Sequence, residues 1–186
     1  MLLALGVLHA APPAADPNPM TGILITARAP VRDPYFGDSV VLVLNNLGSA
    51  PVGIVINRPT TLTVAHLFPD LKQLAQLHDR VYFGGPVDFG SVWFVFRAAK
   101  QPQYAVRACE GVYLSASRGL LLRLLARDRP MEGLRIFSGH AGWAQGQLEH
   151  EIARGDWTLA RAEPDTIFSA KPEHPWPAPE SPRDGT

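Results

Sequence analysis

The stretch GHAGWAQGQLEHEI, residues Gly139–Ile152, combines two unusual features in a short segment of chain: closely spaced glycines, and a large aromatic residue followed by polar ones. Gly139, Gly142 and Gly146 give a backbone that can approach other atoms closely or take positive φ. Among and after these glycines come a large aromatic residue and three polar ones: Trp143, Gln147, Glu149 and Glu151. The pattern predicts a glycine-lined turn that leads into a short helix beginning near Ala144.

The residues at the start of this helix are of the kinds that form small-molecule pockets. Its amide groups and positive dipole end would face an anion, Trp143 would form a flat apolar wall, and Gln147 and Glu149 would supply hydrogen bonds. In the alternative, Trp143 fills the core, while Glu149 or Glu151 forms an internal ion pair with an arginine such as Arg58. Both interpretations stay open.

Two further motifs follow apolar runs. Asn57-Arg58-Pro59 comes after Val52–Ile56; the asparagine can hold a turn and the proline ends strand pairing, whereas Arg58 could bind an anion bidentately. Gly84-Gly85-Pro86 comes after Val81–Phe83 and suits a tight turn where backbones pass closely, or bare amides presented to a ligand. The candidate ligand-binding residues are therefore Asn57, Arg58, Gly84, Gly85, Trp143, Gln147 and Glu149.

The composition is that of a globular chain with balanced charge. Apolar residues make up 46% and charged residues 18%, with 17 basic and 17 acidic side chains among 186 residues. Direct nucleic-acid binding is disfavoured, because phosphate-gripping proteins normally show a basic excess or stripe. Cys109 is the only cysteine, so no intramolecular disulfide or CxxC motif exists. We interpret it as a small apolar residue near a strand end rather than a reactive thiol.

Signatures of common enzyme classes are missing. The chain has no phosphate-binding G-x-x-x-x-G-K-[ST] loop, Ser138 lacks the flanking glycines of a nucleophile elbow, and Arg154 stands where a zincin helix would carry its second histidine. We therefore assign no catalytic residue and no metal ligand, and we expect no cofactor.

Short β-branched and aromatic runs dominate the middle of the chain. Predicted strands are Ile23–Ile25, Val40–Leu44, Val52–Ile56, Val81–Phe83, Val92–Phe96 and Leu134–Phe137. Several are apolar on both alternations, which favours strands covered on both faces. Helical spacing occurs after a capping Ser117, weakly between Thr63 and Leu77, and in the pair Leu148 and Ile152. An α+β domain follows.

The two ends of the chain differ from its middle. Residues 1–19 are apolar and then proline-rich; this resembles a signal peptide, although no Lys or Arg precedes the apolar run. That run is too short to span a bilayer. Residues 170–186 carry five prolines, which predicts an extended tail. The folded domain is expected to occupy residues 20–169.

Five motifs in this order resemble the YqgE/AlgH family of bacterial proteins. They are Gly22–Ile25 with Asp33–Phe36 and Ser39–Val41, then Gly53–Pro59, Gly84–Val87, Leu114–Ser117 and Gly139–Ile152. The resemblance implies an α+β fold in which a branched, mixed sheet forms a pseudo-barrel flanked by helices. It implies the label of putative transcriptional regulator without any agreed enzymatic activity.

The resemblance also has departures. Many members carry cysteine and then histidine at the end of the second strand, where this chain has Leu44 and Asn46, so a thiol mechanism does not transfer. A cytoplasmic location is implied by the resemblance; export to the periplasm is the alternative if Met1–Ala11 is a clipped signal peptide.

Our leading hypothesis is a non-catalytic regulatory protein that binds an unidentified protein or small molecule, so that any effect on transcription is indirect. The alternative is an enzyme acting on a small anionic substrate, with Glu149 or Glu151 as general base, Arg58 as anion clamp and amides near Gly84-Gly85 stabilising charge.

Overall fold

The computed structural model describes residues 22–28, 36–44 and 47–169. Its strands are β1 (Ile23–Ala27), β2 (Val40–Leu44), β3 (Val52–Val55), β4 (Pro59–Thr63), β5 (Arg80–Phe83), β6 (Val87–Arg97), β7 (Val106–Cys109), β8 (Val112–Ser115), β9 (Leu134–Gly142) and β10 (Trp157–Arg161). Its helices are α1 (Val64–Leu67), a 3₁₀ turn (Lys72–Leu74), α2 (Arg118–Leu125), α3 (Gln147–Arg154) and α4 (Pro164–Ser169). The predicted terminal segments, residues 1–19 and 170–186, lie outside the described residues.

The strands form one branched sheet. Its main order is β10-β1-β2-β3-β9-β6-β8-β7, and β5 joins it at β9 while also pairing with β4. The branch arises because β9 changes neighbours along its length: Ala141 and Gly142 pair with β3, whereas Phe137 and Ser138 pair in parallel with β5 and antiparallel with β6. The other strand pairs among the described residues are antiparallel.

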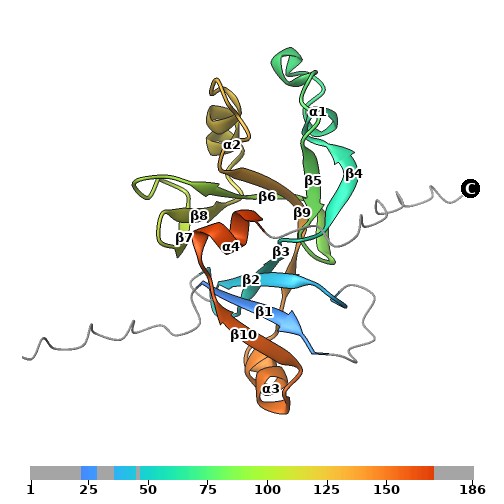
Figure 1. Ribbon diagram of the computed structural model, residues 1–186, viewed down its shortest axis with the longest axis vertical. Helices are drawn as coiled ribbons and strands as arrows, with labels where there is room; N and C mark the ends of the chain where they lie inside the picture. The colour runs from blue at the N-terminus through green and yellow to red at the C-terminus, as the bar shows by residue number, and fades with distance from the viewer. Residues whose placement is uncertain (1–21, 29–35, 45–46, 170–186) are drawn as a thin grey trace, which may run out of the picture.

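The sheet curls into a half-barrel. A Cβ on Gly22, whose φ is +65°, would lie 1.8 Å from the carbonyl oxygen of Ala108 in β7, so the far end of the sheet passes directly against the start of β1. In Figure 1, α3 lies beside β10 at one end, and α1 and α2 lie at the other. The buried Ile167 of α4 packs into the core cluster that also contains Leu42 and Leu114.

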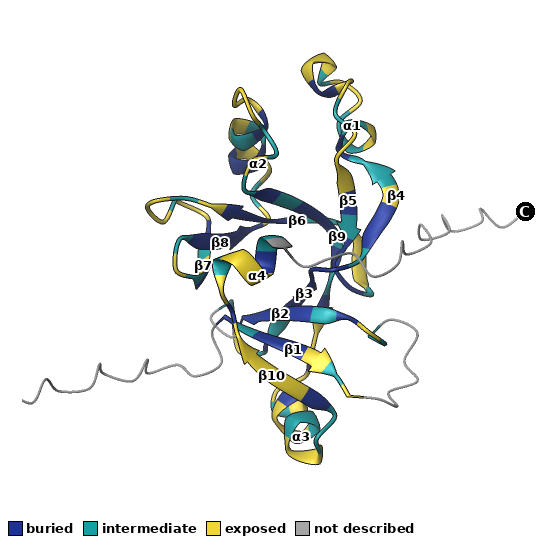
Figure 2. Ribbon diagram, in the orientation of Figure 1, coloured by how far each residue is buried: buried dark blue, intermediate teal, exposed yellow. Residues whose placement is uncertain are grey.

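The central strands are buried on both faces (Figure 2). In β2 and around the end of β3, Leu42, Leu44 and Ile56 belong to the cluster around Ile167, while Val41 and Val55 belong to a second cluster with Trp143 and Leu148. The predicted α+β class, the branched curled sheet and the doubly covered strands are confirmed.

Local differences from the sequence analysis have simple causes. All six predicted strands are present, but β4, β7, β8 and β10 were missed. In β4, β7 and β10 polar residues interrupt the apolar ones, whereas β8 was missed although all four of its residues are buried. The helix expected from Ala144 begins only at Gln147, since Gly146 before it takes a left-handed φ of +78°. Ser117 caps α2 as predicted, accepting a hydrogen bond from the Leu120 amide.

Candidate functional site

Trp143, immediately after β9, is a core residue that also lines a pocket. It is 7% exposed and packs in the cluster that contains Leu148 and Trp157. Gly53 on β3 makes room for it: a Cβ there would lie 2.8 Å from Cζ3 of Trp143 and 2.7 Å from Cγ1 of Val41. The glycine of one sequence motif is thus required by the tryptophan of another.

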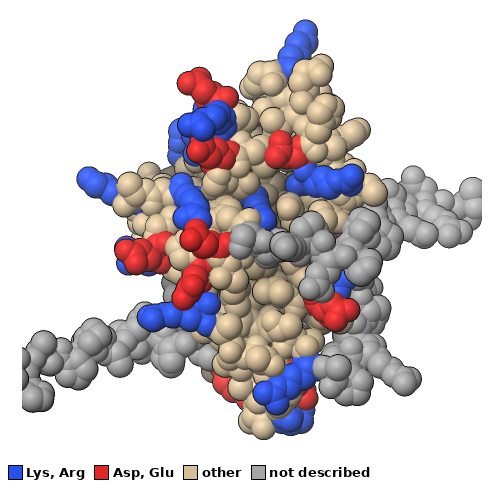
Figure 3. Space-filling model, viewed as in Figure 1, with Lys and Arg blue, Asp and Glu red and all other residues tan. Residues whose placement is uncertain are grey.

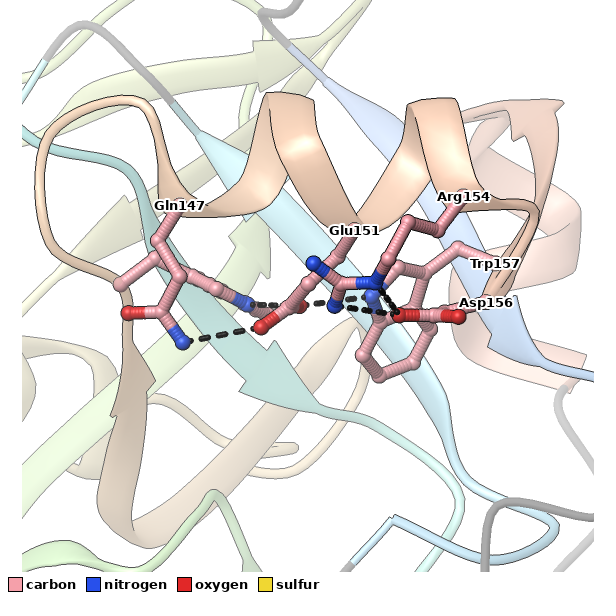
Figure 4. A network of polar contacts seen from close by, with 6 residues as sticks. Gln147, Glu151, Arg154, Asp156 and Trp157 are labelled. Carbon is pink, nitrogen blue, oxygen red and sulfur yellow. Dashed lines mark hydrogen bonds and ion pairs between the residues drawn. The ribbon is translucent and has the colours of Figure 1, made fainter.

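Glu151 connects two tryptophans and a glutamine (Figure 4). Its Oε2 accepts hydrogen bonds from Nε1 of Trp143 and from Nε1 of Trp157, both at 2.9 Å. Its Oε1 accepts from Nε2 of Gln147 at 2.8 Å, one helical turn earlier on α3. Gln147 is itself fixed, because its Oε1 accepts from the Ala144 amide at 3.0 Å. The three donors to Glu151 are neutral, so the carboxylate is held without a cation among the described residues.

A small cavity of about 230 Å³ opens beside this network. It is lined by Phe36, Gly142, Trp143, Gln147, Glu151, Asp156 and Trp157. The ring of Trp157 stands edge-on to Phe36 and to Trp143, with centroid distances of 5.9 and 6.2 Å. Asp156 is paired with Arg154 at 2.6 Å, so Glu151 is the lining carboxylate without a charged partner in the described structure.

Glu149 does not join this pocket. It is exposed on α3, two residues from Glu151 and therefore roughly 200° around the helix from it. Its place in the first turn of the helix is electrostatically favourable. Glu151, which the sequence analysis named only as an alternative, occupies the position expected of Glu149. The i,i+4 spacing from Gln147 to Glu151 could have indicated that these two side chains lie together. No feature of the sequence indicated that Trp157 would join them, because its strand was not predicted.

Asn57 and Arg58 hold a turn against the start of β2. Asn57 is 3% exposed, and its side chain accepts from the Val40 amide and donates to the Asp38 carbonyl, both at 2.9 Å. Arg58 donates from Nε to Ser39 Oγ at 3.1 Å. The alternative of an ion pair between Arg58 and Glu149 or Glu151 is wrong, since Glu151 accepts from the two tryptophans and Gln147 and Glu149 faces solvent.

Gly84 and Gly85 lie where backbones pass in contact. A Cβ on Gly84 would lie 2.2 Å from the Gly139 carbonyl oxygen, and one on Gly85 would lie 2.2 Å from the carbonyl carbon of His140. The Gly84 amide donates to the Ser138 carbonyl, and the Gly84 carbonyl accepts from the Val55 amide, both at 2.8 Å. The geometry therefore favours the close-packed turn over amides presented to a ligand.

The predicted site residues fall into two groups. The second and third motifs meet, because the Phe83 amide donates to the Arg58 carbonyl at 2.7 Å. Trp143 and Gln147 lie at the opposite end of β3, where Val52 pairs with Gly142. Arg58 lies three residues beyond the other end of β3, after a bend at Asn57, and it is not among the residues that line the cavity beside Trp143. Arg58 and Gln147 therefore do not line one pocket.

Cys109 ends β7 and is partly buried. Burial raises the pKa of its thiol, the carboxylates of Glu110 and Glu163 raise it further, and Arg97 opposes them. A raised pKa keeps the sulfur in the poorly nucleophilic thiol form. This agrees with the interpretation of Cys109 as a packing residue at a strand end.

Comparison with known proteins agrees on the family. The AlgH-like family model matches residues 23–179. A UPF0301 protein of Parabacteroides distasonis is 30% identical over 164 residues, covering 87% of this chain and 81% of the relative. A UPF0301 protein of Streptomyces coelicolor is 34% identical over 163 residues, covering 84% and 83%. Within the described residues, no helix is both long and apolar enough to cross a membrane.

Solved structures show the same fold. The solution structure of the AlgH protein from Pseudomonas aeruginosa superposes with a TM-score of 0.68 at 27% identity, covering 86% of this chain and 87% of that one. A crystal structure of a Corynebacterium diphtheriae protein gives a TM-score of 0.64 at 24% identity, covering 89% and 84%. The ordered motifs, the curled branched sheet and these matches agree: the chain belongs to the AlgH-like family, the YqgE/AlgH family that its motifs resemble.

Proposed function

We propose that this protein is a non-catalytic binding protein with a regulatory role, and that its pocket beside Trp143 and Trp157 holds a small organic cation. The observation that carries the proposal is the hydrogen bonding of Glu151. Its carboxylate accepts from two indoles and one amide, all neutral, so no cationic side chain among the described residues pairs with it at the edge of the cavity.

The walls of the cavity support the same ligand class. Three aromatic rings, those of Phe36, Trp143 and Trp157, line it together with Glu151. Aromatic faces attract cations, and cages of such rings suit substituted ammonium groups. A volume of about 230 Å³ is small; pockets for drug-sized ligands are roughly 300–1,000 Å³. The expected occupant is a single ammonium head group, either free or at the end of a longer chain.

The geometry gives less support to the other two functions. The enzyme alternative needs Arg58 and a carboxylate in one pocket, and these groups lie at opposite ends of β3. Direct nucleic-acid binding needs a basic stripe, and the face in Figure 3 shows acidic and basic side chains interspersed. An effect on transcription would therefore be indirect and would depend on occupancy of the pocket.

The test is a titration of the full-length protein with choline and with Nε-trimethyl-lysine, followed by tryptophan fluorescence. The matched pair of variants is Glu151→Gln and Glu149→Gln, which remove one negative charge each from the same helix. We expect saturable binding that Glu151→Gln weakens about tenfold, the loss of roughly 1.4 kcal/mol for a charged contact, and that Glu149→Gln leaves unchanged. Absence of saturable binding, or equal weakening by both variants, would overturn the proposal.

A further inference from the structure

Three arginines on neighbouring strands share one face of the sheet. Arg135 lies near the start of β9, at the opposite end of that strand from Gly142 and the tryptophan pocket. Arg135 of β9 pairs with Val95 of β6, so Arg97, two residues further along β6, points to the same side. On the other flank, Tyr82 of β5 pairs in parallel with Phe137, two residues beyond Arg135. Arg80, two residues before Tyr82, is thereby on the same face next to Arg135. Strands are only about 4.8 Å apart, so three positive charges are brought close together.

Arg135 is the innermost of these arginines. It is partly buried, and its guanidinium lies 5.0 Å from the ring centre of Tyr82. It donates to three carbonyl oxygens, those of Ile56 at 3.2 Å, Ile167 at 3.0 Å and Phe168. Burial lowers its pKa, which Tyr82 partly opposes. No carboxylate in the described residues pairs with it. The guanidinium is therefore partly desolvated, and only neutral carbonyl groups compensate for its lost hydration.

Capping of α4 explains part of this arrangement but not all of it. Arg135 fixes the carbonyls at the C-terminal end of α4, a position where a cation is favourable. That role does not account for Arg80 or Arg127, which are exposed and line the same cavity. The hydrogen bonds of these two side chains also go to carbonyl oxygens, Arg80 to Thr60 and Arg127 to Leu124, Pro130 and Glu132.

A cavity of about 660 Å³ lies over this cluster. Its lining includes four arginines, Arg80, Arg97, Arg127 and Arg135, against two acidic residues, Asp79 and Glu132. Glu132 is already paired with Arg129, which is outside the lining, at 3.0 Å. Arg97 has one exposed partner, Asp165, at 2.8 Å. The lining is therefore net positive, although the whole chain has no net charge. Basic side chains are visible on this face just above α4 (Figure 3).

We infer that this cavity is a binding site for a phosphate-bearing small molecule. Guanidinium groups present paired N–H donors whose geometry matches phosphate oxygens, and several around one cavity favour an anion with more than one charge. The volume is within the range of small-molecule sites. Tyr82 and Phe168 are also in the lining, and Arg97 lies 4.8 Å from the centre of the Phe168 ring. The site is separate from the proposed cation pocket and does not depend on it.

Calorimetric titration of the full-length protein with pyrophosphate tests the inference, with citrate as a carboxylate of comparable charge. The informative variant is Arg80→Gln, since Arg80 is exposed and lines the cavity. The matched control is Arg123→Gln, an exposed arginine of α2 outside the lining. Both variants remove one positive charge from the chain. Arg80→Gln also removes the hydrogen bond to the Thr60 carbonyl, so the stability of both variants is measured alongside binding.

We expect pyrophosphate to bind, Arg80→Gln to weaken binding about tenfold through the loss of one charge-assisted contact, and Arg123→Gln to leave it unchanged. Urea unfolding of both variants confirms that the folded state is retained. Three results would overturn the inference: no heat of binding with pyrophosphate, equal weakening by both variants, or citrate binding at least as tightly as pyrophosphate. The last would assign the cavity to carboxylates.

Discussion

Replacement of Glu151 by glutamine tests how much the negative charge of this hydrogen-bond acceptor contributes to stability, because glutamine has nearly the same shape but is neutral. The carboxylate accepts three hydrogen bonds, two on Oε2 from indoles and one on Oε1 from Gln147. A glutamine has one carbonyl oxygen and one NH₂ group. If its oxygen stays with the indoles, its NH₂ group faces the NH₂ group of Gln147; if it turns over, both indoles lose their acceptor. The less costly arrangement loses one bond and weakens two.

The size of the effect follows from these bonds. A hydrogen bond to a charged group contributes about 1.5–3 kcal/mol and one between neutral groups about 0.5–1.5. Since Glu151 is only partly buried, the lost bond is taken at the low value of about 1.5 kcal/mol, and the two retained bonds, now between neutral groups near the top of their range, together lose about 0.5 kcal/mol. Glu151→Gln should therefore lower the free energy of unfolding by about 2 kcal/mol. Glu151→Ala leaves two indole N–H groups without an acceptor, at about 1–3 kcal/mol each, so a loss of about 4 kcal/mol is expected.

Urea unfolding followed by tryptophan fluorescence measures both changes. With a typical slope of about 2 kcal/mol per molar urea, Glu151→Gln should move the midpoint down by about 1 M. Glu149→Gln, which removes an exposed charge near the start of α3, should cost at most about 0.5 kcal/mol. If the two variants unfold at the same urea concentration, Glu151 does not hold the tryptophans as the geometry indicates, and the reasoning fails.

Three further predictions concern packing, capping and the thiol. Gly84→Ala should cost about 3 kcal/mol or more in urea unfolding, because its Cβ meets the backbone of Gly139, whereas Gly142→Ala, with nothing within 4 Å, should be near neutral; equal effects would contradict this. Ser117→Ala should lower the free energy of unfolding by about 0.5–1 kcal/mol, the low end for a cap, because the bond to Leu120 is 3.4 Å long; restoration by Asp is the check. Cys109 should react with iodoacetamide more slowly at pH 8 than a free cysteine, its rate rising only at higher pH because burial raises its pKa; a rate at or above the free value would refute this.

The parts of the fold that were predictable from the sequence are those with strong local signals. Runs such as Val40–Leu44 are apolar on both alternations and became strands buried on both faces. The cap at Ser117 and the pair Leu148 and Ile152 are also local, and the structure confirms them. β10 carries only Trp157 as a buried residue, so its sequence resembles a polar loop until β1 pairs with it.

The candidate site shows where local signals end. Residue types and closeness in sequence were enough to place Trp143 and Gln147 together, since only four residues separate the end of β9 from the start of α3. Whether Glu149 or Glu151 faces the pocket depends on the helix register, which the late start at Gln147 sets. The distance between Arg58 and this group depends on which end of β3 pairs with β9. That pairing is set by the tertiary structure and cannot be predicted from the spacing of residues in the sequence.

The glycines in the sequence motifs are required for different physical reasons. The atoms that a Cβ would contact at each position distinguish these reasons. A Cβ on Gly84, Gly85 or Gly139 would meet backbone atoms at 2.2–2.5 Å, so close packing excludes a side chain at all three; Gly85 and Gly139 also take positive φ. Gly142 has ordinary φ and nothing within 4 Å of its Cβ position, yet it lines the aromatic cavity. Neither packing nor conformation requires a glycine there, and a side chain at that position would project into open space beside the cavity. Gly142→Val should therefore leave the urea midpoint unchanged while reducing choline binding, as only a glycine retained for access to the pocket would.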